Sequence, residues 1–441
     1  MEKRILLKNI DCPDLHRLAK YEELGGYAAA RAALASEPAS LIQAIKRSGL
    51  RGRGGAGFST GTKWEFIPKN SGKPVYLICN ADESEPGTFK DRLLMERDPH
   101  LCLEGMIISA WAIGAHWACV YIRGEYAYSY ERLKLAIDEC YQKGYLGKNI
   151  FGSDFNFDII LHRGAGAYIC GEETALIESL EGKKGQPRLK PPFFPAAIGL
   201  YKAPTIVNNV ETLCAVTRIF QMGADAYAAL GTEKSKGTKL FSVSGHVNKP
   251  GVYEVEMGYP LLDLINVECG GVWKDRALKG VIPGGSSMPI LTAEELKGVV
   301  LDYESIQAAG SYLGSGGFIV FDETANMLDV ACNIAHFYAH ESCGQCTPCR
   351  EGAHWIEKIF NRIASGGGIR SDLSLIESIA KQVEGHTICV FGEAFVWPAK
   401  AFVKKFPDDF ANLLSDQDRL IQIERRKEIG ERQINKGVEL S

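Results

Sequence analysis

The sequence feature that most restricts how this chain can fold is a run of three cysteines, Cys343, Cys346 and Cys349, with two residues between neighbours. Thiolates at this spacing can bind one inorganic centre, and the run is typical of a 4Fe-4S site. On one continuous helix the three side chains would spread over about 9 Å of axis and about 120° of circumference, which suits a cluster poorly. The spacing therefore predicts a turn within the run.

Pro348 supports this turn, because proline disfavours the α conformation at Thr347 and fits the first turn of a new helix. The positive end of that helix would face the bound thiolates. A cluster of this kind needs a fourth ligand, and Cys389 is the only cysteine that follows the run. We expect Cys389 to be that ligand, with His386 as the competing candidate. A zinc knuckle and three unrelated buried thiols are the alternative interpretations.

The composition is that of an ordinary globular chain. With 441 residues, of which 46% are hydrophobic and 24% charged, the chain can bury a large core in several domains. Its net charge of −4 argues against nucleic acid as a partner. The chain contains thirteen cysteines, and its first residues do not resemble an export signal. This combination is typical of a protein in a reducing compartment.

One segment, residues 105–122, has no Asp, Glu, Lys or Arg over 18 positions. The pattern around it predicts a helix that begins at Pro99 and ends at Gly114, followed by a buried strand from Trp117. Because neither element is long enough to cross a bilayer, we expect no direct membrane insertion.

Residues 49–61 contain six glycines in 13 positions, a density that lets backbone amides approach a ligand closely. Three of them match a dinucleotide fingerprint, but that fingerprint must follow a strand, and the preceding segment is predicted to be helical. The segment also lacks the ending of a Walker A loop. We expect a phosphate or ribose cradle with Arg51, Arg53 and Lys63 nearby; a flexible surface loop is the alternative.

Polar residues also gather where a predicted buried strand ends. The strand covers residues 74–79 and runs into Asn80, Asp82, Glu83 and Glu85. The carboxyl ends of strands are where α/β sheets bind ligands, and these side chains can accept hydrogen bonds from a ribose or a flavin. A solvated acidic turn is the alternative interpretation.

Helices and strands then alternate, which predicts a mostly parallel α/β sheet. The expected elements are helix 98–113, strand 117–123, helix 128–143 and strand 157–162. The last strand runs into a second glycine-rich turn, residues 164–174, which carries Tyr168, Glu172 and Glu173. Two such turns can hold two nucleotides, one as cofactor and one as substrate.

The pattern of predicted secondary structure changes near residue 238. Strands at 240–245 and 252–256 flank a Lys-Pro-Gly turn and predict a hairpin, and a helix at 260–267 and a strand at 318–321 complete a compact α+β unit. After residue 325 the pattern is entirely helical. The expected helices there lie near 352–364, 373–384, 393–405 and 416–434. The last of these is expected to dock against another subunit, and capping of the bundle is the alternative.

These changes divide the chain into four parts. They are an N-terminal helical segment with the glycine-rich loop (1–70), a Rossmann-like domain (71–237), an α+β domain (238–325) and a helical domain with the cysteine run (326–441).

Four segments, residues 51–64, 79–91, 164–174 and 341–349, occur in an order that resembles the NADH-binding flavoprotein subunit of respiratory complex I. The resemblance extends over nearly the whole chain. It implies an α/β Rossmann-like FMN/NADH domain, a small α+β ubiquitin-like (β-grasp) domain and a C-terminal all-α helical bundle that carries one 4Fe-4S cluster. It also implies hydride transfer from NADH to FMN and single-electron transfer to the cluster, in an NADH:quinone oxidoreductase.

Carried over motif by motif, the resemblance implies three sets of site residues. FMN contacts fall to Gly52, Arg53, Gly54, Lys63, Asn80, Asp82, Glu83, Tyr168, Gly171, Glu172, Asn208 and Asn209. NADH contacts fall to Phe58, Phe66, Glu85, Glu173, Lys190 and Phe193. The cluster ligands are Cys343, Cys346, Cys349 and Cys389.

No side chain is expected to act as an acid or base, because hydride passes directly to FMN, and Glu85 is expected to position the reactants. Acidic residues beside the NAD ribose disfavour a 2′-phosphate, which predicts NADH rather than NADPH as substrate.

The resemblance implies that the chain functions with two partners of the same complex, a small 2Fe-2S subunit and a large iron-sulfur subunit. It also implies a position in the cytoplasm at the inner face of the cell membrane. The flavoprotein (diaphorase) subunits of NAD-linked hydrogenases and formate dehydrogenases are similar, and many carry additional iron-sulfur domains. This chain has no further cysteine run before residue 50 or after Cys389, which favours the respiratory form. A different class of function is the alternative, namely a zinc-stabilised nucleotide-binding module without enzyme activity.

Overall fold

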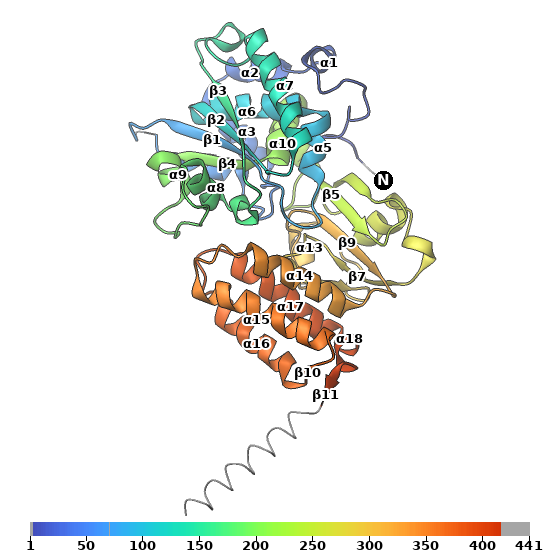
Figure 1. Cartoon of the computed structure of the whole chain (residues 1–441). Helices are drawn as coiled ribbons and strands as arrows, with labels where there is room; N and C mark the ends of the chain where they lie inside the picture. The colour runs from blue at the N-terminus through green and yellow to red at the C-terminus, as the bar shows by residue number, and fades with distance from the viewer. Residues whose placement is uncertain (1–2, 70, 416–441) are drawn as a thin grey trace, which may run out of the picture. The chain divides into compact units, whose positions relative to one another are not determined.

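The computed structural model describes residues 3–69 and 71–415. The chain separates into two compact units, residues 1–324 and residues 325–441 (Figure 1). The helix expected at 416–434 lies outside the described residues.

The first unit contains a four-stranded parallel sheet, as the alternation of helices and strands predicts. Its strands are β1 (Val75–Ala81), β2 (Ala115–Ile122), β3 (Asp158–Arg163) and β4 (Thr205–Asn209), in the order β3-β2-β1-β4. The chain moves outward from β1 to β3 and then returns to place β4 on the other side of β1. The direction of strand order therefore reverses between β1 and β4, and ligands of open α/β sheets bind at such a reversal.

Ten α-helices accompany this sheet in the described part of residues 18–222. They are α1 (Leu18–Glu23), α2 (Ala28–Leu34), α3 (Pro38–Ser48), α4 (Thr60–Glu65), α5 (Lys90–Arg97), α6 (Pro99–Ile113), α7 (Ala127–Lys143) and α10 (Val210–Met222), with the shorter α8 (Glu173–Leu180) and α9 (Pro195–Ile198) after β3. The expected helices and strands between 98 and 162 are confirmed, with ends displaced by two residues at most.

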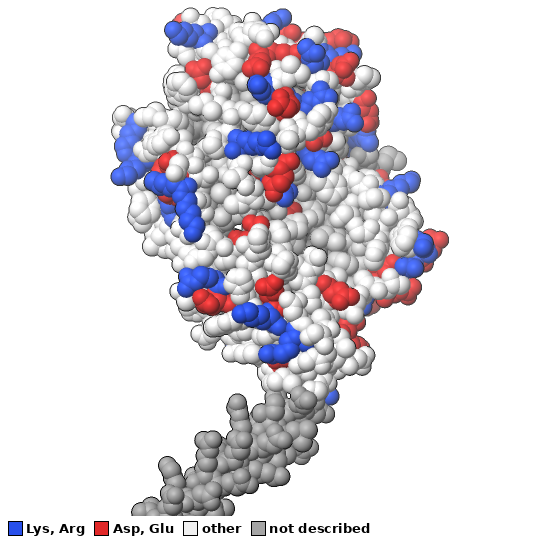
Figure 2. Space-filling model, in the orientation of Figure 1, with Lys and Arg blue, Asp and Glu red and all other residues white. Residues whose placement is uncertain are grey.

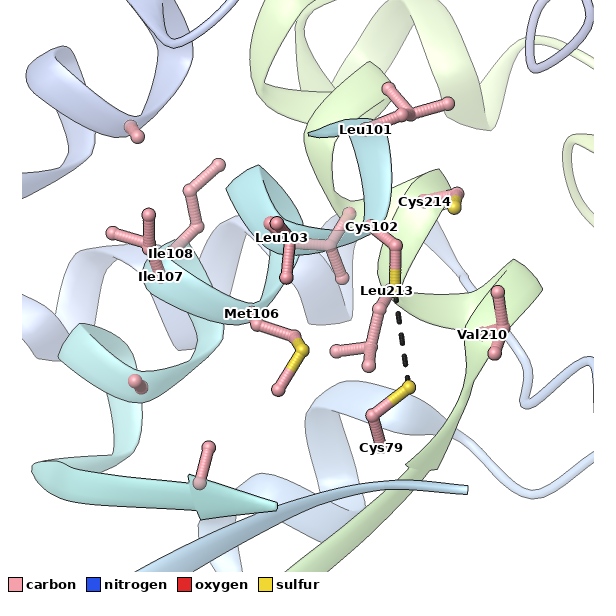
Figure 3. Packing of buried hydrophobic residues seen from close by; sticks show 14 of the residues in the cluster. Cys79, Leu101, Cys102, Leu103, Met106, Ile107, Ile108, Val210, Leu213 and Cys214 are labelled. Carbon is pink, nitrogen blue, oxygen red and sulfur yellow. Dashed lines mark hydrogen bonds between the residues drawn. The ribbon is translucent and has the colours of Figure 1, made fainter. Parts of the chain in front are cut away.

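Helices α6 and α10 pack on each other and on the sheet, and apolar side chains fill the space between them (Figure 3). Cys79 from β1, Met106 from α6 and Leu213 from α10 belong to this core. A Cβ on Gly105 would come within 2.0 Å of the Leu213 carbonyl oxygen, so the close approach of the two helices requires glycine. The uncharged segment 105–122 is thus a buried helix followed by a strand. Among the described residues, no helix has the length and hydropathy needed to span a bilayer.

A second, five-stranded sheet completes the first unit. Its strands are β5 (Thr238–Gly245), β6 (Gly251–Glu256), β7 (Leu278–Ile282), β8 (Leu291–Thr292) and β9 (Gly317–Asp322), in the order β6-β5-β9-β7-β8. The predicted hairpin is confirmed as the antiparallel pair β5 and β6. The helix expected at 260–267 is present as α12 (Leu261–Asp263), which continues into a π-helical turn at Leu264–Glu268, and α13 (Tyr303–Ala308) follows later.

The second unit consists mainly of helices. They are α14 (Met327–Glu341), α15 (Thr347–Ala364), α16 (Ser371–Val383), α17 (Phe391–Lys405) and α18 (Pro407–Ala411). The expectation of an entirely helical segment is wrong at one place, because β10 (Gly368–Ile369) pairs in parallel with β11 (Leu414–Ser415). Helix α15 also begins five residues before the expected 352, since Pro348 fits its first turn.

Basic and acidic side chains are interspersed on the face of the chain that Figure 2 displays. This distribution agrees with the small net charge of −4.

The buried carboxylate of Glu254 on β6 ties the N-terminal segment to the second sheet. It accepts hydrogen bonds from the backbone N–H groups of Ile5, Leu6 and Leu7 at 2.8, 2.9 and 2.9 Å and from the Thr238 hydroxyl at 2.5 Å. Four donors on one carboxylate satisfy both oxygens, which compensates for the removal of the charge from water.

Replacing Glu254 with Gln should lower the free energy of unfolding by about 2 kcal/mol, because an amide has only one oxygen and leaves buried donors unpaired. Urea unfolding followed by circular dichroism measures this change. Glu294→Gln is the matched control, since that carboxylate is 78% exposed and pairs with Lys297 at the surface. The control should change stability by about 0.5 kcal/mol at most. Equal stability of the two variants would contradict the role of Glu254.

Candidate functional site

Two neighbouring parallel strands, β1 and β4, bring an asparagine pair together at their carboxyl ends. Asn80 of β1 is in register with Asn209 of β4, and Cys79 with Asn208. The Asn80 side-chain amide donates to the Gly171 carbonyl at 2.9 Å, so the second glycine-rich turn lies at the same edge. Sequence reasoning placed all these segments near a ligand, and the structure brings them to one place.

The first glycine-rich loop lies against the same strand ends. A Cβ on Gly54 would come within 3.0 Å of the Asn209 Cβ, which shows how closely the backbone passes β4. Gly57 has a φ of +65°, a left-handed conformation that glycine adopts without strain. The loop is closed by a hydrogen bond from the Gly52 N–H to the Phe58 carbonyl at 2.8 Å. A loop of this kind can present backbone amides to a phosphate.

Two lysines and two glutamates link α4 and the loop before α9 to the start of α8. The Lys63 ammonium donates to Glu173 at 2.8 Å and to the Val207 carbonyl at 2.9 Å. The Lys190 ammonium donates to Glu172 at 2.9 Å and to Glu173 at 3.2 Å. Burial alone would raise the pKa of Glu173, but the two neighbouring ammonium groups outweigh it and lower this pKa below its usual value. Glu173 is therefore ionised at neutral pH.

Glu172 also caps the next helix, because it accepts hydrogen bonds from the Thr174 and Ala175 N–H groups at 2.8 and 2.9 Å. This cap fixes the start of α8, and with it the position of Glu173, the first residue of that helix.

Glu85 is held by residues from both sheets of the first unit. The Tyr168 hydroxyl donates to one carboxylate oxygen at 2.6 Å and the Ser287 N–H to the other at 2.8 Å. A Cβ on Gly285 would lie 2.4 Å from the Glu85 Cγ, so the loop approaches this side chain very closely. Burial raises the pKa of Glu85, while these hydrogen bonds oppose the shift. Sequence reasoning missed the Gly285–Ser287 contribution; its only signal is a Gly-Gly-Ser-Ser turn, which does not reveal its partner.

Three aromatic side chains that were expected to stack on a nucleotide are solvent-exposed. Phe58, Phe66 and Phe193 are 51%, 55% and 40% exposed, and the Phe58 and Phe66 ring centroids lie 6.0 Å apart. Exposed aromatic rings near a polar site leave apolar area for a planar ligand to cover.

Two residues that were expected to contact a ligand also have hydrogen-bond partners within the protein. The Arg53 guanidinium is buried and donates to the Tyr227 hydroxyl at 3.2 Å and the Lys236 carbonyl at 2.6 Å. The Glu83 carboxylate is also buried and accepts from the N–H groups of Asp91 and Arg92, at 2.7 and 2.9 Å, at the start of α5. Both side chains therefore also hold the scaffold, and their expected contacts with FMN stay a prediction.

The remaining expected contacts lie in the same segments. The Asn208 side chain accepts from the Trp64 indole N–H at 2.9 Å, and the Asp82 N–H donates to the Asn80 side chain at 3.1 Å.

The cysteine run joins two helices of the second unit. Cys343 follows the end of α14, Cys346 caps α15 and Cys349 lies in its first turn, while Cys389 lies in the loop between α16 and α17. The Cys346 Sγ accepts a hydrogen bond from the Ile388 N–H at 3.3 Å, so this loop lies beside the run. The turn and the loop position of Cys389 are thus as expected.

The thiols of the run are close enough to influence one another. Burial is the main cause that raises the pKa of Cys349 to about 11, and the neighbouring Cys343 and Cys346 add to this shift. Within residues 3–69 and 71–415, no three Cys, His, Asp or Glu side chains are arranged to hold a single metal ion. In a 4Fe-4S cluster each thiolate binds a different iron, and a cysteine run with this spacing is typical of such a cluster.

Comparison with known proteins gives three family matches and many similar chains. Residues 45–218 match the Nuo51 FMN-binding domain, residues 239–310 the SLBB domain, and residues 329–413 the NADH-ubiquinone oxidoreductase-F iron-sulfur binding region.

The F 2 subunit of the NADH-quinone oxidoreductase of Rhizobium meliloti (strain 1021) is 52% identical over 411 residues, which cover 93% of this chain and 97% of the relative. The NADH-quinone oxidoreductase F subunit of Rickettsia bellii (strain OSU 85-389) is 48% identical over 407 residues, covering 92% and 97%. A chain in the crystal structure of an NAD+-reducing NiFe hydrogenase in the H2-reduced state is 39% identical, with a TM-score of 0.83 over 94% of this chain and 67% of that chain. With this identity over nearly its whole length, the chain belongs to the family of NADH-quinone oxidoreductase F subunits.

Proposed function

We propose that this chain oxidises NADH as the flavoprotein subunit of an NADH-quinone oxidoreductase that feeds electrons to a membrane respiratory complex. When bound, FMN accepts a hydride from NADH, and a 4Fe-4S cluster carries the electrons away one at a time. The observation that carries this proposal is the convergence of both glycine-rich segments on Asn80 and Asn209, in a chain whose second unit holds the four cysteines.

FMN is assigned to the strand ends of β1 and β4. The Asn80 and Asn209 amides each use one N–H within the protein, which leaves one hydrogen per amide for a ligand. The Lys63 ammonium and the loop amides favour negative charge there. The assigned residues are Gly52, Arg53, Gly54, Lys63, Asn80, Asp82, Glu83, Tyr168, Gly171, Glu172, Asn208 and Asn209.

NADH is assigned to the exposed aromatic residues and the neighbouring charges. Phe58, Phe66 and Phe193 offer ring faces, Lys190 offers a cation, and Glu173 accepts hydrogen bonds from ribose hydroxyls. Glu85, fixed by Tyr168 and Ser287, positions the reactants without exchanging a proton. The chain therefore contributes position and electrostatics to hydride transfer rather than acid or base catalysis.

The cluster is assigned to Cys343, Cys346, Cys349 and Cys389. The SLBB match and the β5 to β9 sheet support a ubiquitin-like domain over 238–325, between a Rossmann-like domain over 71–237 and a helical bundle over 326–441, with 1–70 as the N-terminal segment.

We infer a small 2Fe-2S subunit and a large iron-sulfur subunit as partners, and a cytoplasmic position at the inner face of the cell membrane. The similar hydrogenase chain supports a second candidate, the diaphorase subunit of an NAD-linked hydrogenase or formate dehydrogenase.

Anaerobic titration with NADH tests the proposed function. Flavin absorbance should bleach, and an EPR signal of a reduced cluster should follow. Cys349→Ser should lose iron and the EPR signal while flavin still bleaches, because the cysteine lies in the second unit. Cys332→Ser, a cysteine of α14 outside the run, is the control and should retain both. A colourless protein that holds zinc, without iron or flavin, would contradict the proposal.

Replacing Glu173 with Gln should relax the preference for NADH over NADPH. The change removes a negative charge that repels a 2′-phosphate and frees Lys63 and Lys190 to attract one. We expect the ratio of kcat/KM for NADH to that for NADPH to fall about tenfold, equivalent to about 1.4 kcal/mol. Glu131→Gln, an exposed carboxylate on α7, should leave the ratio unchanged. Unaltered selectivity in Glu173→Gln would remove this residue from the NADH site.

A further inference from the structure

A chain of four buried charges extends from Asn209 into the interior of the first unit. The Asn209 amide donates to the Asp91 carboxylate at 2.6 Å, whose other oxygen accepts from the Lys90 ammonium at 2.8 Å. Lys90 also lies 2.8 Å from the Glu211 carboxylate, and the Lys239 ammonium lies 3.7 Å from the same carboxylate. The four charged side chains are at most 4% exposed.

The charge chain connects the two sheets of the first unit. Glu211, in the first turn of α10, accepts a hydrogen bond from the Leu240 N–H of β5 at 2.8 Å. Lys239, also on β5, donates to the Ser315 carbonyl at 3.0 Å and to the Arg53 carbonyl at 3.3 Å. The last contact reaches the glycine-rich loop, so the charge chain touches the proposed flavin site at two points.

Asn209 is fixed at both ends of its amide. Its nitrogen donates to Asp91, and its oxygen accepts from the Glu211 N–H at 3.0 Å. The Asp91 carboxylate therefore orients this amide directly, whereas Glu211 orients it through its backbone N–H and not through its carboxylate. A change in the charges of these four side chains therefore acts on the Asn209 amide, which we assign to the FMN site.

Stability alone is a weak reason to bury these charges, because replacing a buried ion pair by apolar side chains is often neutral or stabilising. Removed from water, the charges are poorly screened, and their field extends to neighbouring groups. Burial lowers the pKa of Lys239 to about 7, although Glu211 opposes the shift. Lys90 keeps its proton, because Asp91 and Glu211 together overcome the same penalty.

We propose that Asp91, Lys90, Glu211 and Lys239 set the difference in affinity between oxidised and reduced flavin, and so tune the midpoint potential of the bound FMN. This inference rests on the proposed function. Accepting a hydride adds one negative charge to the flavin. A cation near the site therefore favours the reduced form, whereas an anion near the site favours the oxidised form. These are positioning residues that act through Asn209 and through their field.

The test compares two neutralising substitutions at adjacent positions in the full chain. Lys90→Met removes a cation and should lower the flavin potential, whereas Asp91→Asn removes an anion and should raise it. Each should change the ratio of the FMN dissociation constants of the two redox forms about tenfold, which for a two-electron couple is about 30 mV. Both variants break the same ion pair, so a purely structural role would not shift the potentials in opposite directions.

Spectroelectrochemical titration of bound FMN measures the potentials without relying on turnover. Asp98→Asn is the control, because that carboxylate is equally buried but faces Arg218, about two turns further along α10 from Glu211. The control should keep the wild-type potential. If either first variant fails to bind FMN, Lys239→Met replaces Lys90→Met and Glu211→Gln replaces Asp91→Asn, with the same signs expected.

Shifts of the same sign, unchanged potentials, or loss of FMN from all four variants would overturn this inference. A wild-type chain that binds no FMN would overturn the proposed function instead, so the two failures are distinguishable.

Discussion

The parallel pairing of β1 with β4 is the constraint on which the candidate site depends. It sets Asn80 opposite Asn209 at the point where strand order reverses, and it brings the residues that follow each strand to one edge of the sheet. Gly54 favours the close passage of the glycine-rich loop along this edge, because a Cβ at this position would lie 3.0 Å from the Asn209 Cβ. The core behind the sheet keeps the strands in place, through the close contact of α6 and α10 at Gly105 (Figure 3).

Much of the first sheet could be predicted from the sequence, since its strands are short apolar runs and its helices begin and end at residues such as Pro99 and Gly114. The cysteine run also identified its own local structure, because the spacing and Pro348 together require a turn before a helix. Strands β4, β7 and β8 were not predicted, because they are only five, five and two residues long. In addition, β4 pairs with β1 and β7 with β9, and neither partner is near in the sequence.

The sequence was less informative about which polar side chains face a ligand. Arg53 and Glu83 belong to motifs rich in glycine and acid, yet both are buried and hold the scaffold. Conversely, Ser287 reaches Glu85 from 202 positions away, and Lys239 of β5 pairs with Glu211 of α10. A pattern along the chain cannot reveal such contacts, because they depend on how separate elements pack rather than on local spacing.

The central claim is that a flavin binds where the glycine-rich loop passes β4, and an equilibrium titration of the flavin-free chain with FMN tests it most directly. Quenching of flavin fluorescence should indicate one bound FMN per chain. In Gly54→Val, side-chain atoms would enter the space beside Asn209, where even a Cβ lies at 3.0 Å, and the affinity should fall at least about tenfold. Wild-type affinity in this variant, with the fold intact by circular dichroism, would contradict the account.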